Sequence, residues 1–268
     1  MTRVNFGGNA MGRVIVCVSR KGGVGKTTTV ANLAAAGVSA GSTVAMIDLD
    51  TQGTLSRWAM GRAGVDRLTP ERSVRVLTRV NSGAAEPVLT RVNFADDRPE
   101  FVHPVNAIPG AFVVPVSPAI RLDDVSSITL PESVADWIVD TSPDTGSSVV
   151  HAAIRMATDI VIPVAPELWC LESIPEVLGA LRDAGRDDLL ERFAVVINMR
   201  MKNATHDALE TLLRQAYGKQ VSSVVFPRAV AFAESALKQS VIPTKSANGK
   251  LFASLWRTVT SKTLRKVA

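Results

Sequence analysis

The chain has 268 residues, of which 46% are hydrophobic, and a formal net charge of +5. This length is enough for one large α/β domain with a substantial core. No run of about 18 apolar residues occurs, and residues 1–12 lack the apolar centre of a signal peptide, so we expect no transmembrane helix and a cytoplasmic protein. Two isolated cysteines, Cys17 and Cys170, make neither a disulfide framework nor a metal site.

Charge is unevenly distributed along the chain. The last acidic residue is Glu234. Up to and including it, the chain holds 23 basic and 25 acidic residues, whereas the segment after it is basic only. A basic C-terminal segment on a nearly neutral body favours a polyanionic partner, either nucleic acid or a membrane surface, although a solvated helix face is a simpler alternative. The basic residues after Glu234 are Lys238, Lys245, Lys250, Arg257, Lys262, Arg265 and Lys266.

The N-terminal residues 1–12 are polar and contain glycine and asparagine, which predicts a flexible segment. The first strong motif follows it, between an apolar run at 14–18 and an alanine-rich segment at 29–40. A strand, a glycine-rich turn and a helix in this order are the context that a phosphate-binding loop requires. The glycines allow backbone N–H groups to converge on phosphate oxygens, and the helix N-terminus adds partial positive charge. Lys26 is expected to contact the β- and γ-phosphates, and the Thr27 hydroxyl to coordinate Mg²⁺.

This loop departs from the standard pattern G-x-x-x-x-G-K-[ST]. Arg20 stands where the first glycine belongs, and Lys21 adds a second lysine at the front of the loop. The resulting K-G-G-x-G-K-T resembles the deviant Walker A loop of the ParA/MinD family of ATPases. The resemblance implies ATP and Mg²⁺ as cofactors, and a lysine, here Lys21, that crosses a dimer interface to touch the nucleotide of the other subunit. The expected nucleotide-binding residues of the loop are Lys21, Gly22, Gly23, Val24, Gly25, Lys26, Thr27 and Thr28.

The next apolar run, at 43–47, ends in the acidic element D-L-D-T-Q-G. Carboxylates just beyond a strand lie where open α/β sheets bind ligands, and the alternation places Asp48 and Asp50 on the same side near the phosphate loop. The element resembles D-x-D-P-Q-G of the ParA family, with Thr51 in place of proline. The resemblance implies that Asp50 positions or activates the attacking water and that Asp48 lies near the Mg²⁺ shell. Two loop acids that only cap a turn are the alternative.

A second acidic element ends the apolar segment at 133–139. An apolar strand that terminates in an aspartate, here Asp140, is typical of phosphate-loop ATPases, in which the carboxylate holds Mg²⁺ through water. The ParA family has D-x-P-P at this place, and Ser142 replaces the first proline. An aspartate that only caps the next turn is the alternative.

Apolar strands near residues 14, 44, 113, 135, 160 and 194 alternate with helical stretches. This pattern predicts a mostly parallel, twisted sheet with helices on both faces. We see no linker, so residues 13–268 are expected to form a single α/β domain of the P-loop NTPase class, with a basic C-terminal helix. The F-P-R element at 226–228 resembles a late I-P-R element that lies against the adenine in the ParA family. Asn198 and Pro227 are therefore the candidates for contact with the base.

The resemblance covers most of residues 13–245 and implies a slow ATP-hydrolysing switch. The implied protein forms an ATP-sandwich homodimer, binds DNA non-specifically on the nucleoid, and drives plasmid or chromosome partition with a ParB-like partner that stimulates hydrolysis. DNA binding of this kind would use basic side chains on phosphates. The candidate DNA-binding residues are Arg200, Lys202, Lys245, Lys250, Arg257 and Lys262.

The alternative function is a MinD-like positioning ATPase that associates with membranes in the presence of ATP. Five apolar residues near the C-terminus have the spacing of one helix face above the terminal bases. Packing of this face on the domain's own core is the simpler reading of the same pattern. The residues are Leu251, Phe252, Leu255, Trp256 and Val259.

Overall fold

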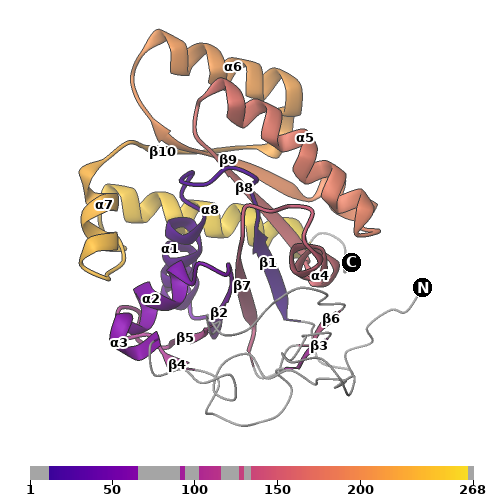
Figure 1. The fold of residues 1–268 in the computed structure, drawn as a ribbon. Helices are drawn as coiled ribbons and strands as arrows, with labels where there is room; N and C mark the ends of the chain where they lie inside the picture. Colours follow the sequence, from indigo (N-terminus) through magenta and orange to yellow (C-terminus); the bar gives the residue numbers. More distant parts are fainter. Residues whose placement is uncertain (1–11, 66–90, 94–102, 116–126, 130–133, 265–268) are drawn as a thin grey trace.

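A central sheet of eight strands organises the molecule (Figure 1). The computed structural model describes residues 12–65, 91–93, 103–115, 127–129 and 134–264. Seven of the described strands in this sheet run parallel, and the edge strand β4 pairs with β5 in the antiparallel direction. In sheet order the strands are β10 (Val221–Pro227), β9 (Phe193–Arg200), β8 (Asp159–Val164), β1 (Arg13–Cys17), β7 (Asp136–Thr141), β2 (Val44–Leu49), β5 (Ala111–Val114) and β4 (His103–Pro104).

Six of these strands were expected from the sequence, and the mostly parallel α/β fold is confirmed. The edge strand β4, the last strand β10 and a separate two-stranded parallel sheet of β3 (Arg91–Asn93) and β6 (Ser127–Thr129) were not expected. Strand β7 begins at Asp136, somewhat later than the apolar segment predicted. The expected flexible segment at 1–12 lies, except for Gly12, outside the described residues.

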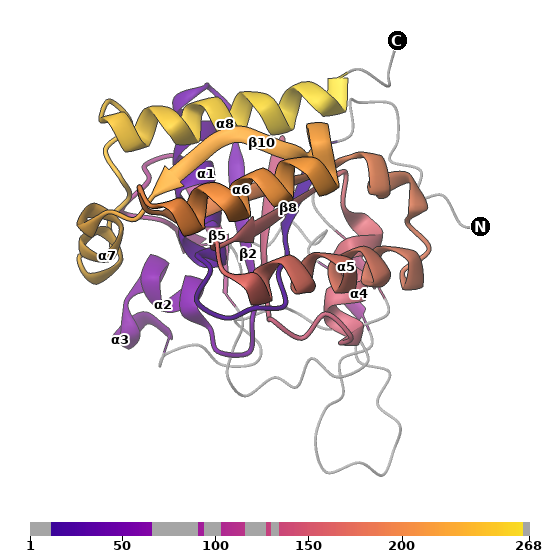
Figure 2. The same cartoon turned by 90° about the horizontal axis from the view of Figure 1, so that it is seen from above.

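Helices cover both faces of the sheet, as Figure 2 shows with α8 and α5 on opposite sides. The alternation along β1 decides which side chain faces which layer. Val14 and Val16 pack with residues of α4 and α5, whereas Ile15 and Cys17 pack with residues of α1 and α8. The helices are α1 (Lys26–Ser39), α2 (Thr54–Met60), α3 (Arg62–Val65), α4 (Ser148–Met156), α5 (Leu168–Asp183), α6 (Ala204–Tyr217), α7 (Val230–Leu237) and α8 (Ala247–Leu264), with short 3₁₀ turns η3 (Asp187–Glu191) and η4 (Gly218–Gln220).

The apolar face of α8 belongs to the core. Phe252, Leu255, Trp256 and Val259 are buried in the layer that contains α1. A Cβ atom added at Gly37 of α1 would lie 2.7 Å from the Trp256 ring, so the absence of a side chain there lets the two helices approach closely. The face that the membrane alternative requires is therefore already occupied within the chain. None of the described helices combines the length and the apolar character that a bilayer span requires.

Candidate functional site

The glycine-rich loop joins the end of β1 to the first residue of α1, at the carboxyl edge of the parallel sheet. Gly23 and Gly25 have φ angles of 77° and 89°, a left-handed conformation that favours glycine. No atom lies within 4 Å of a Cβ placed on Gly22 or Gly23, so the space in front of the loop is open. The first turn of α1 contains no acidic residue. Its N–H groups and helix dipole therefore suit an anion such as a phosphate.

Lys26 is buried and its side chain lies along the inside of the loop. Its Nζ donates to the carbonyl oxygens of Ser19 and Lys21, each at 3.2 Å. These two bonds hold the ammonium group at the mouth of the loop, beside the open space. A positive charge placed in this way can neutralise a phosphate that binds to the loop backbone.

Thr27 and Asp140 lie together at the base of the loop. The Thr27 hydroxyl donates to Oδ2 of Asp140 at 2.6 Å, while Oδ1 of Asp140 is buried and has no hydrogen-bond partner among the described residues. Burial, and then the nearby Asp48 carboxylate, raise the pKa of Asp140 to about 8. A buried carboxylate with an unsatisfied oxygen beside a hydroxyl is a donor set that suits Mg²⁺, which prefers oxygen ligands. The residues present therefore fit a divalent cation.

Asp48 is buried next to Asp140, its partner in the register of β2 and β7. Its Oδ2 accepts from the backbone N–H and the hydroxyl of Ser56, at 2.7 and 2.6 Å, and its Oδ1 accepts from the N–H of Asp50 at 3.1 Å. Burial raises the pKa of Asp48 to about 6. Both oxygens thus bind the start of α2 and the turn before it, the contact that the turn-capping alternative expects, although the sequence did not identify Ser56 as the partner.

Asp50 lies after the end of β2, half-buried at the same edge of the sheet. Its Oδ1 accepts from the backbone N–H of Gln52 at 3.0 Å, which closes a local turn, and its backbone carbonyl accepts from Gly53. Because the Asp50 N–H binds Asp48, the two acids are held in a fixed relation. Asp50 is the more accessible carboxylate of the pair.

The two basic residues at the front of the loop both contact α5 or the residue before it. Lys21 forms an ion pair with Glu167, and Arg20 forms one with Glu176. Neither pairing was predicted from the sequence, because each acid lies about 150 residues away from its partner. The contacts join the front of the loop to α5 and to the residue that precedes it.

Asn198 is buried near the end of β9 and forms a hydrogen bond to the backbone of the loop. Its amide donates to the carbonyl oxygen of Val24 at 2.9 Å, and it lies 3.4 Å from the Thr29 hydroxyl. Pro227 is exposed at the last position of β10. A pocket of about 370 Å³ opens beside Thr27 and Thr28, between α1, α2 and α7, within the size range of small-molecule sites.

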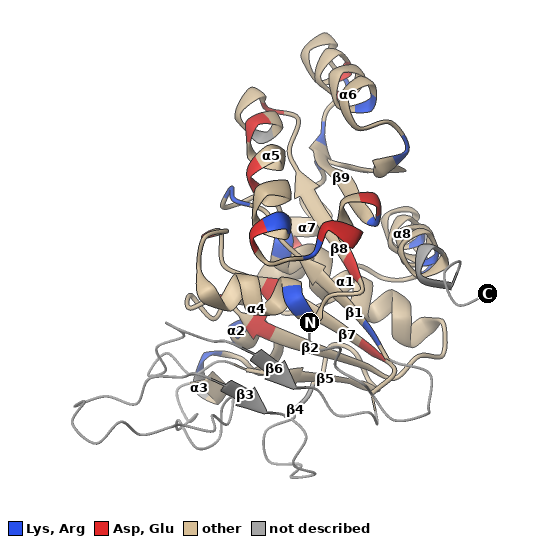
Figure 3. Cartoon of the chain, turned by 90° about the vertical axis from the view of Figure 1, so that its right-hand side faces the viewer, with Lys and Arg blue, Asp and Glu red and all other residues tan. Residues whose placement is uncertain are grey.

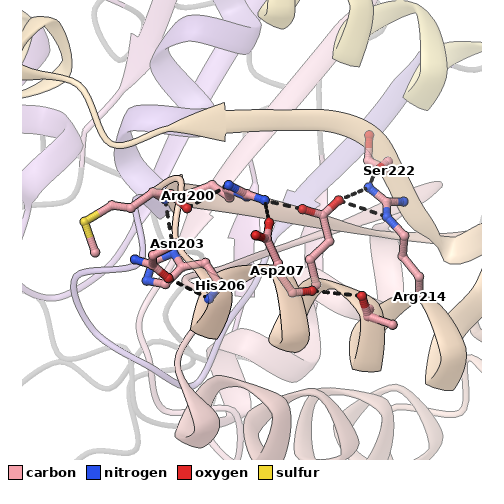
Figure 4. Close-up of polar contacts among 9 residues, drawn as sticks. Arg200, Asn203, His206, Asp207, Arg214 and Ser222 are labelled. Atoms are coloured by element: carbon pink, nitrogen blue, oxygen red, sulfur yellow. Dashed lines mark hydrogen bonds and ion pairs between the residues drawn. The ribbon is translucent and has the colours of Figure 1, made fainter.

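Arg200 is the expected DNA-binding residue with the most contacts (Figure 4). Its guanidinium pairs with Asp207 and Glu210 of α6 and donates to the Met201 carbonyl at 2.7 Å. Glu210 also accepts from Arg214, so the group forms a network along α6. The charge of Arg200 is therefore largely neutralised within the chain.

The other basic candidates differ from Arg200 in their surroundings. Lys202, Lys245, Lys250 and Arg257 are exposed. Lys250 and Arg257 are seven residues apart on α8, hence near one face, and Figure 3 shows no acidic residue on this helix. The side chain of Lys262 lies outside the described residues.

Comparison with known proteins agrees with this architecture. The family model "CobQ/CobB/MinD/ParA nucleotide binding domain" matches residues 15–242. The chromosome-partitioning ATPase Soj of Thermus thermophilus is 29% identical over 83% of this chain and 84% of its own length. The septum site-determining protein MinD of Thermotoga maritima is 30% identical over 70% of this chain and 64% of its own length.

A solved structure gives the same result for the fold. The putative plasmid partition protein of Borrelia burgdorferi bound to AMPPNP superposes with a TM-score of 0.73 at 17% identity, over 94% of this chain and 99% of that one. The resemblance that the loop motif indicated is therefore confirmed over most of the sequence. The chain belongs to the CobQ/CobB/MinD/ParA family of nucleotide-binding domains.

Proposed function

We propose that this protein is a ParA-like ATPase that acts as a slow nucleotide-dependent switch in plasmid or chromosome partition. The observation that carries the proposal is the buried Oδ1 of Asp140, which has no hydrogen-bond partner in the described part of the chain and lies beside the Thr27 hydroxyl, at the start of a helix preceded by an open glycine-rich loop. This arrangement combines a phosphate site with a cation site at one edge of the sheet. A nucleoside triphosphate with Mg²⁺ has the matching charges.

In this proposal, the loop from Gly22 to Gly25 binds the phosphate oxygens through its backbone N–H groups, with Thr27 and Thr28 at the helix N-terminus. Lys26 then exchanges its two carbonyl contacts for the β- and γ-phosphates. Thr27 and Asp140 would hold Mg²⁺, with Asp48 next to Asp140 in the sheet. The ion would stabilise negative charge on the transferred phosphoryl group.

Asp50 is the proposed positioning group for the attacking water. It is accessible, and its link to Asp48 keeps it at the edge of the phosphate site. The water oxygen attacks the γ-phosphorus, the bond to the oxygen that bridges the β- and γ-phosphates breaks, and the proton of the water passes to Asp50 or to a phosphate oxygen. The products are ADP and inorganic phosphate. Asn198 and Pro227 are the proposed contacts of the base.

Lys21 is the proposed contact between two subunits. In the monomer it is paired with Glu167 at the exposed front of the loop, where a second copy has access to it. Transfer of Lys21 to the nucleotide of the partner would make ATP a bridge between two chains. Hydrolysis would remove the γ-phosphate that both subunits contact and so release the dimer.

DNA binding by the dimer is the proposed output, through phosphate contacts that carry no sequence preference. Lys202, Lys245, Lys250 and Arg257 are exposed and support this role, with Lys262 as a further candidate on α8. A ParB-like, centromere-binding partner would then stimulate hydrolysis and move the cargo over the nucleoid. The MinD-like alternative loses its main support in the packing of α8, since the apolar face of this helix is buried.

The test is DNA binding by the purified protein with ATP, with ADP and without nucleotide, beside the variants Lys21→Ala and Asp50→Ala. We expect ATP to promote binding, Lys21→Ala to abolish it, and Asp50→Ala to prolong it. Binding should also weaken steeply as the salt concentration rises. Retention on DNA that is independent of both nucleotide and salt would contradict the partition function. In that case, ATP-dependent sedimentation with anionic liposomes tests the membrane alternative.

A further inference from the structure

The pocket beside the phosphate loop has a lining that suits an anion. It lies between α1, α2 and α7, which Figures 1 and 2 show on one side of the molecule, and its volume is about 370 Å³. Its α1 wall includes Thr27 and Thr28, so it opens next to the candidate phosphate and cation site. Hydroxyl groups from all three helices line it, and Arg57 of α2 is the one charged residue among the described residues of its wall.

The Arg57 guanidinium is not neutralised by any carboxylate of the described chain. Its side chain is exposed, and no hydrogen bond or ion pair joins the guanidinium to a residue that the structure describes. Arg20 and Arg200, which lie near the carboxyl ends of β1 and β9, are by contrast paired with acids. The positive charge of Arg57 is therefore available to a ligand in the pocket.

The backbone that carries Arg57 is held in place, whereas the end of its side chain is not. Ser56, the preceding residue, binds the Asp48 carboxylate through its N–H and its hydroxyl, at 2.7 and 2.6 Å. The Arg57 carbonyl accepts from the side-chain amide of Gln239 at 2.7 Å. Asp48 is the neighbour of Asp140 in the sheet register, so these bonds keep α2 beside the candidate cation site.

The guanidinium folds back along α2 toward the start of this helix. A Cβ atom placed on Gly53, the residue before α2, would lie 3.9 Å from Nη1 of Arg57. The N–H of Gly53 is bound in turn to the Asp50 carbonyl at 2.8 Å. The cation therefore lies at the end of α2 that follows the acidic turn, on the wall of the pocket that Thr27 and Thr28 also border.

Charge matching indicates which part of a nucleotide this cation would meet. In the proposed function, Lys26 contacts the β- and γ-phosphates, and Thr27 and Asp140 hold Mg²⁺. No cation of the same chain is assigned to the α-phosphate. The pocket wall continues from Thr28 along α1 to Ala31, away from the loop, so a nucleotide with its terminal phosphates on the loop can place its α-phosphate at the mouth of the pocket.

We propose that Arg57 binds the α-phosphate of the nucleotide from the side of this pocket. The inference rests on the proposed function, because it requires a nucleotide whose terminal phosphates lie on the loop. Arginine suits this role, since its planar guanidinium can donate two parallel hydrogen bonds to phosphate oxygens. The α-phosphate is present in both ATP and ADP and takes no part in the bond that breaks. Arg57 therefore strengthens the binding of both nucleotides to the same extent and leaves the hydrolysis rate at saturating ATP unchanged.

The experiment compares Arg57→Ala and Arg57→Lys with Arg62→Ala, a matched control at an exposed arginine of α3 that does not line the pocket. Calorimetric titration with Mg²⁺ present measures the Kd of ADP and of a non-hydrolysable ATP analogue, and phosphate release measures KM and kcat. We expect Arg57→Ala to weaken the binding of both nucleotides about tenfold and to raise KM by the same factor, with kcat within about twofold of the original. Arg57→Lys should recover part of the lost affinity, because lysine keeps the charge without the paired donors. Arg62→Ala should change none of these quantities.

Urea unfolding without nucleotide separates this role from a structural one. Arg57→Ala should unfold at the original midpoint, since it retains the carbonyl that Gln239 binds. A lower midpoint together with a lower kcat would identify a structural role and overturn the inference.

The two nucleotides distinguish the remaining failures. If Arg57→Ala binds both with the original Kd, the inference is overturned and the proposed function stands. Weaker binding of the ATP analogue alone also overturns it, because the contact would then be to the γ-phosphate. If the unaltered chain binds neither nucleotide, both the inference and the proposed function are rejected.

Discussion

Replacement of Trp256 by alanine is the most informative test of how the C-terminal helix is placed. The indole is 4% exposed and lies against Gly37 of α1, and the Arg13 guanidinium lies 5.5 Å from the ring centroid. Truncation removes the ring from the contact between α1 and α8 but leaves the rest of the apolar face in place. The change therefore measures how strongly α8 is bound to the domain.

The expected magnitude follows from the area that the side chain buries. A tryptophan removes about 200 Å² from water, which at about 25 cal/mol per Å² corresponds to roughly 5 kcal/mol. Unfolded chains already bury part of this area, so we expect a loss of about 3–5 kcal/mol in the free energy of unfolding. With a urea dependence of about 3 kcal/mol per molar for a chain of this size, the midpoint should fall by about 1–1.7 M.

Urea unfolding followed by circular dichroism at the helix band measures this change without relying on the lost fluorophore. Trp169→Ala is the matched control, since that tryptophan is 67% exposed and its loss should change stability by no more than about 0.5 kcal/mol in the nucleotide-free protein. A loss below about 1 kcal/mol for Trp256→Ala would refute the reasoning. It would mean that α8 is loosely held and that its apolar face is available to a membrane.

Three further predictions concern the loop, the surface charges and pH. Gly25→Ala should weaken ATP binding at least about tenfold in a nucleotide titration, because Gly25 has a φ of 89° and the new Cβ would lie 3.0 Å from the Asn198 amide nitrogen; unchanged affinity would contradict the loop geometry. Arg200→Ala should reduce ATP-dependent DNA affinity less than Lys202→Ala, since Arg200 is paired with two acids; the reverse order in a binding assay would show that these pairs open on DNA. The hydrogen bonds from Arg186 lower the pKa of Asp188. The contribution of this carboxylate to the free energy of unfolding is therefore complete above the ordinary pKa of an aspartate, and it is lost as the pH falls through the lowered pKa. Asp188→Asn should therefore lower the urea midpoint slightly at pH 7 and progressively less below about pH 4, and a difference that is constant with pH would contradict this cause.

The parts of the site that the sequence predicted are those encoded by short stretches. Strand, loop and helix around Lys26 are adjacent in the chain, and Asp140 was proposed because it directly follows an apolar run in the sequence. The spacing of Asp48 and Asp50 placed both at the correct edge of the sheet. The spacing did not show whether Asp48 caps the turn, as its bonds to Ser56 at the start of α2 do, or lies near the Mg²⁺ shell. Both roles require an aspartate at this position.

The contacts that the sequence did not predict join residues that are far apart in the chain. Lys21 and Glu167 are separated by 146 residues, and Arg13 and Asp136 by 123 residues, so no local pattern connects them. The environment of the apolar face of α8 could not be predicted for a different reason. Its apolar spacing suits a membrane or a core equally well, and only the packing against α1 distinguishes the two.

The release of phosphate from ATP by the purified protein tests the central claim most directly. The measurement compares the unaltered chain, Lys26→Ala and Asp50→Ala, with ATP binding determined in parallel and Mg²⁺ either present or removed by a chelator. We expect slow, Mg²⁺-dependent release by the unaltered chain, loss of ATP binding in Lys26→Ala, and retained binding without release in Asp50→Ala. If Asp50→Ala releases phosphate at the original rate, or if the unaltered chain binds ATP without ever releasing phosphate, the account of this site as a hydrolytic switch is contradicted.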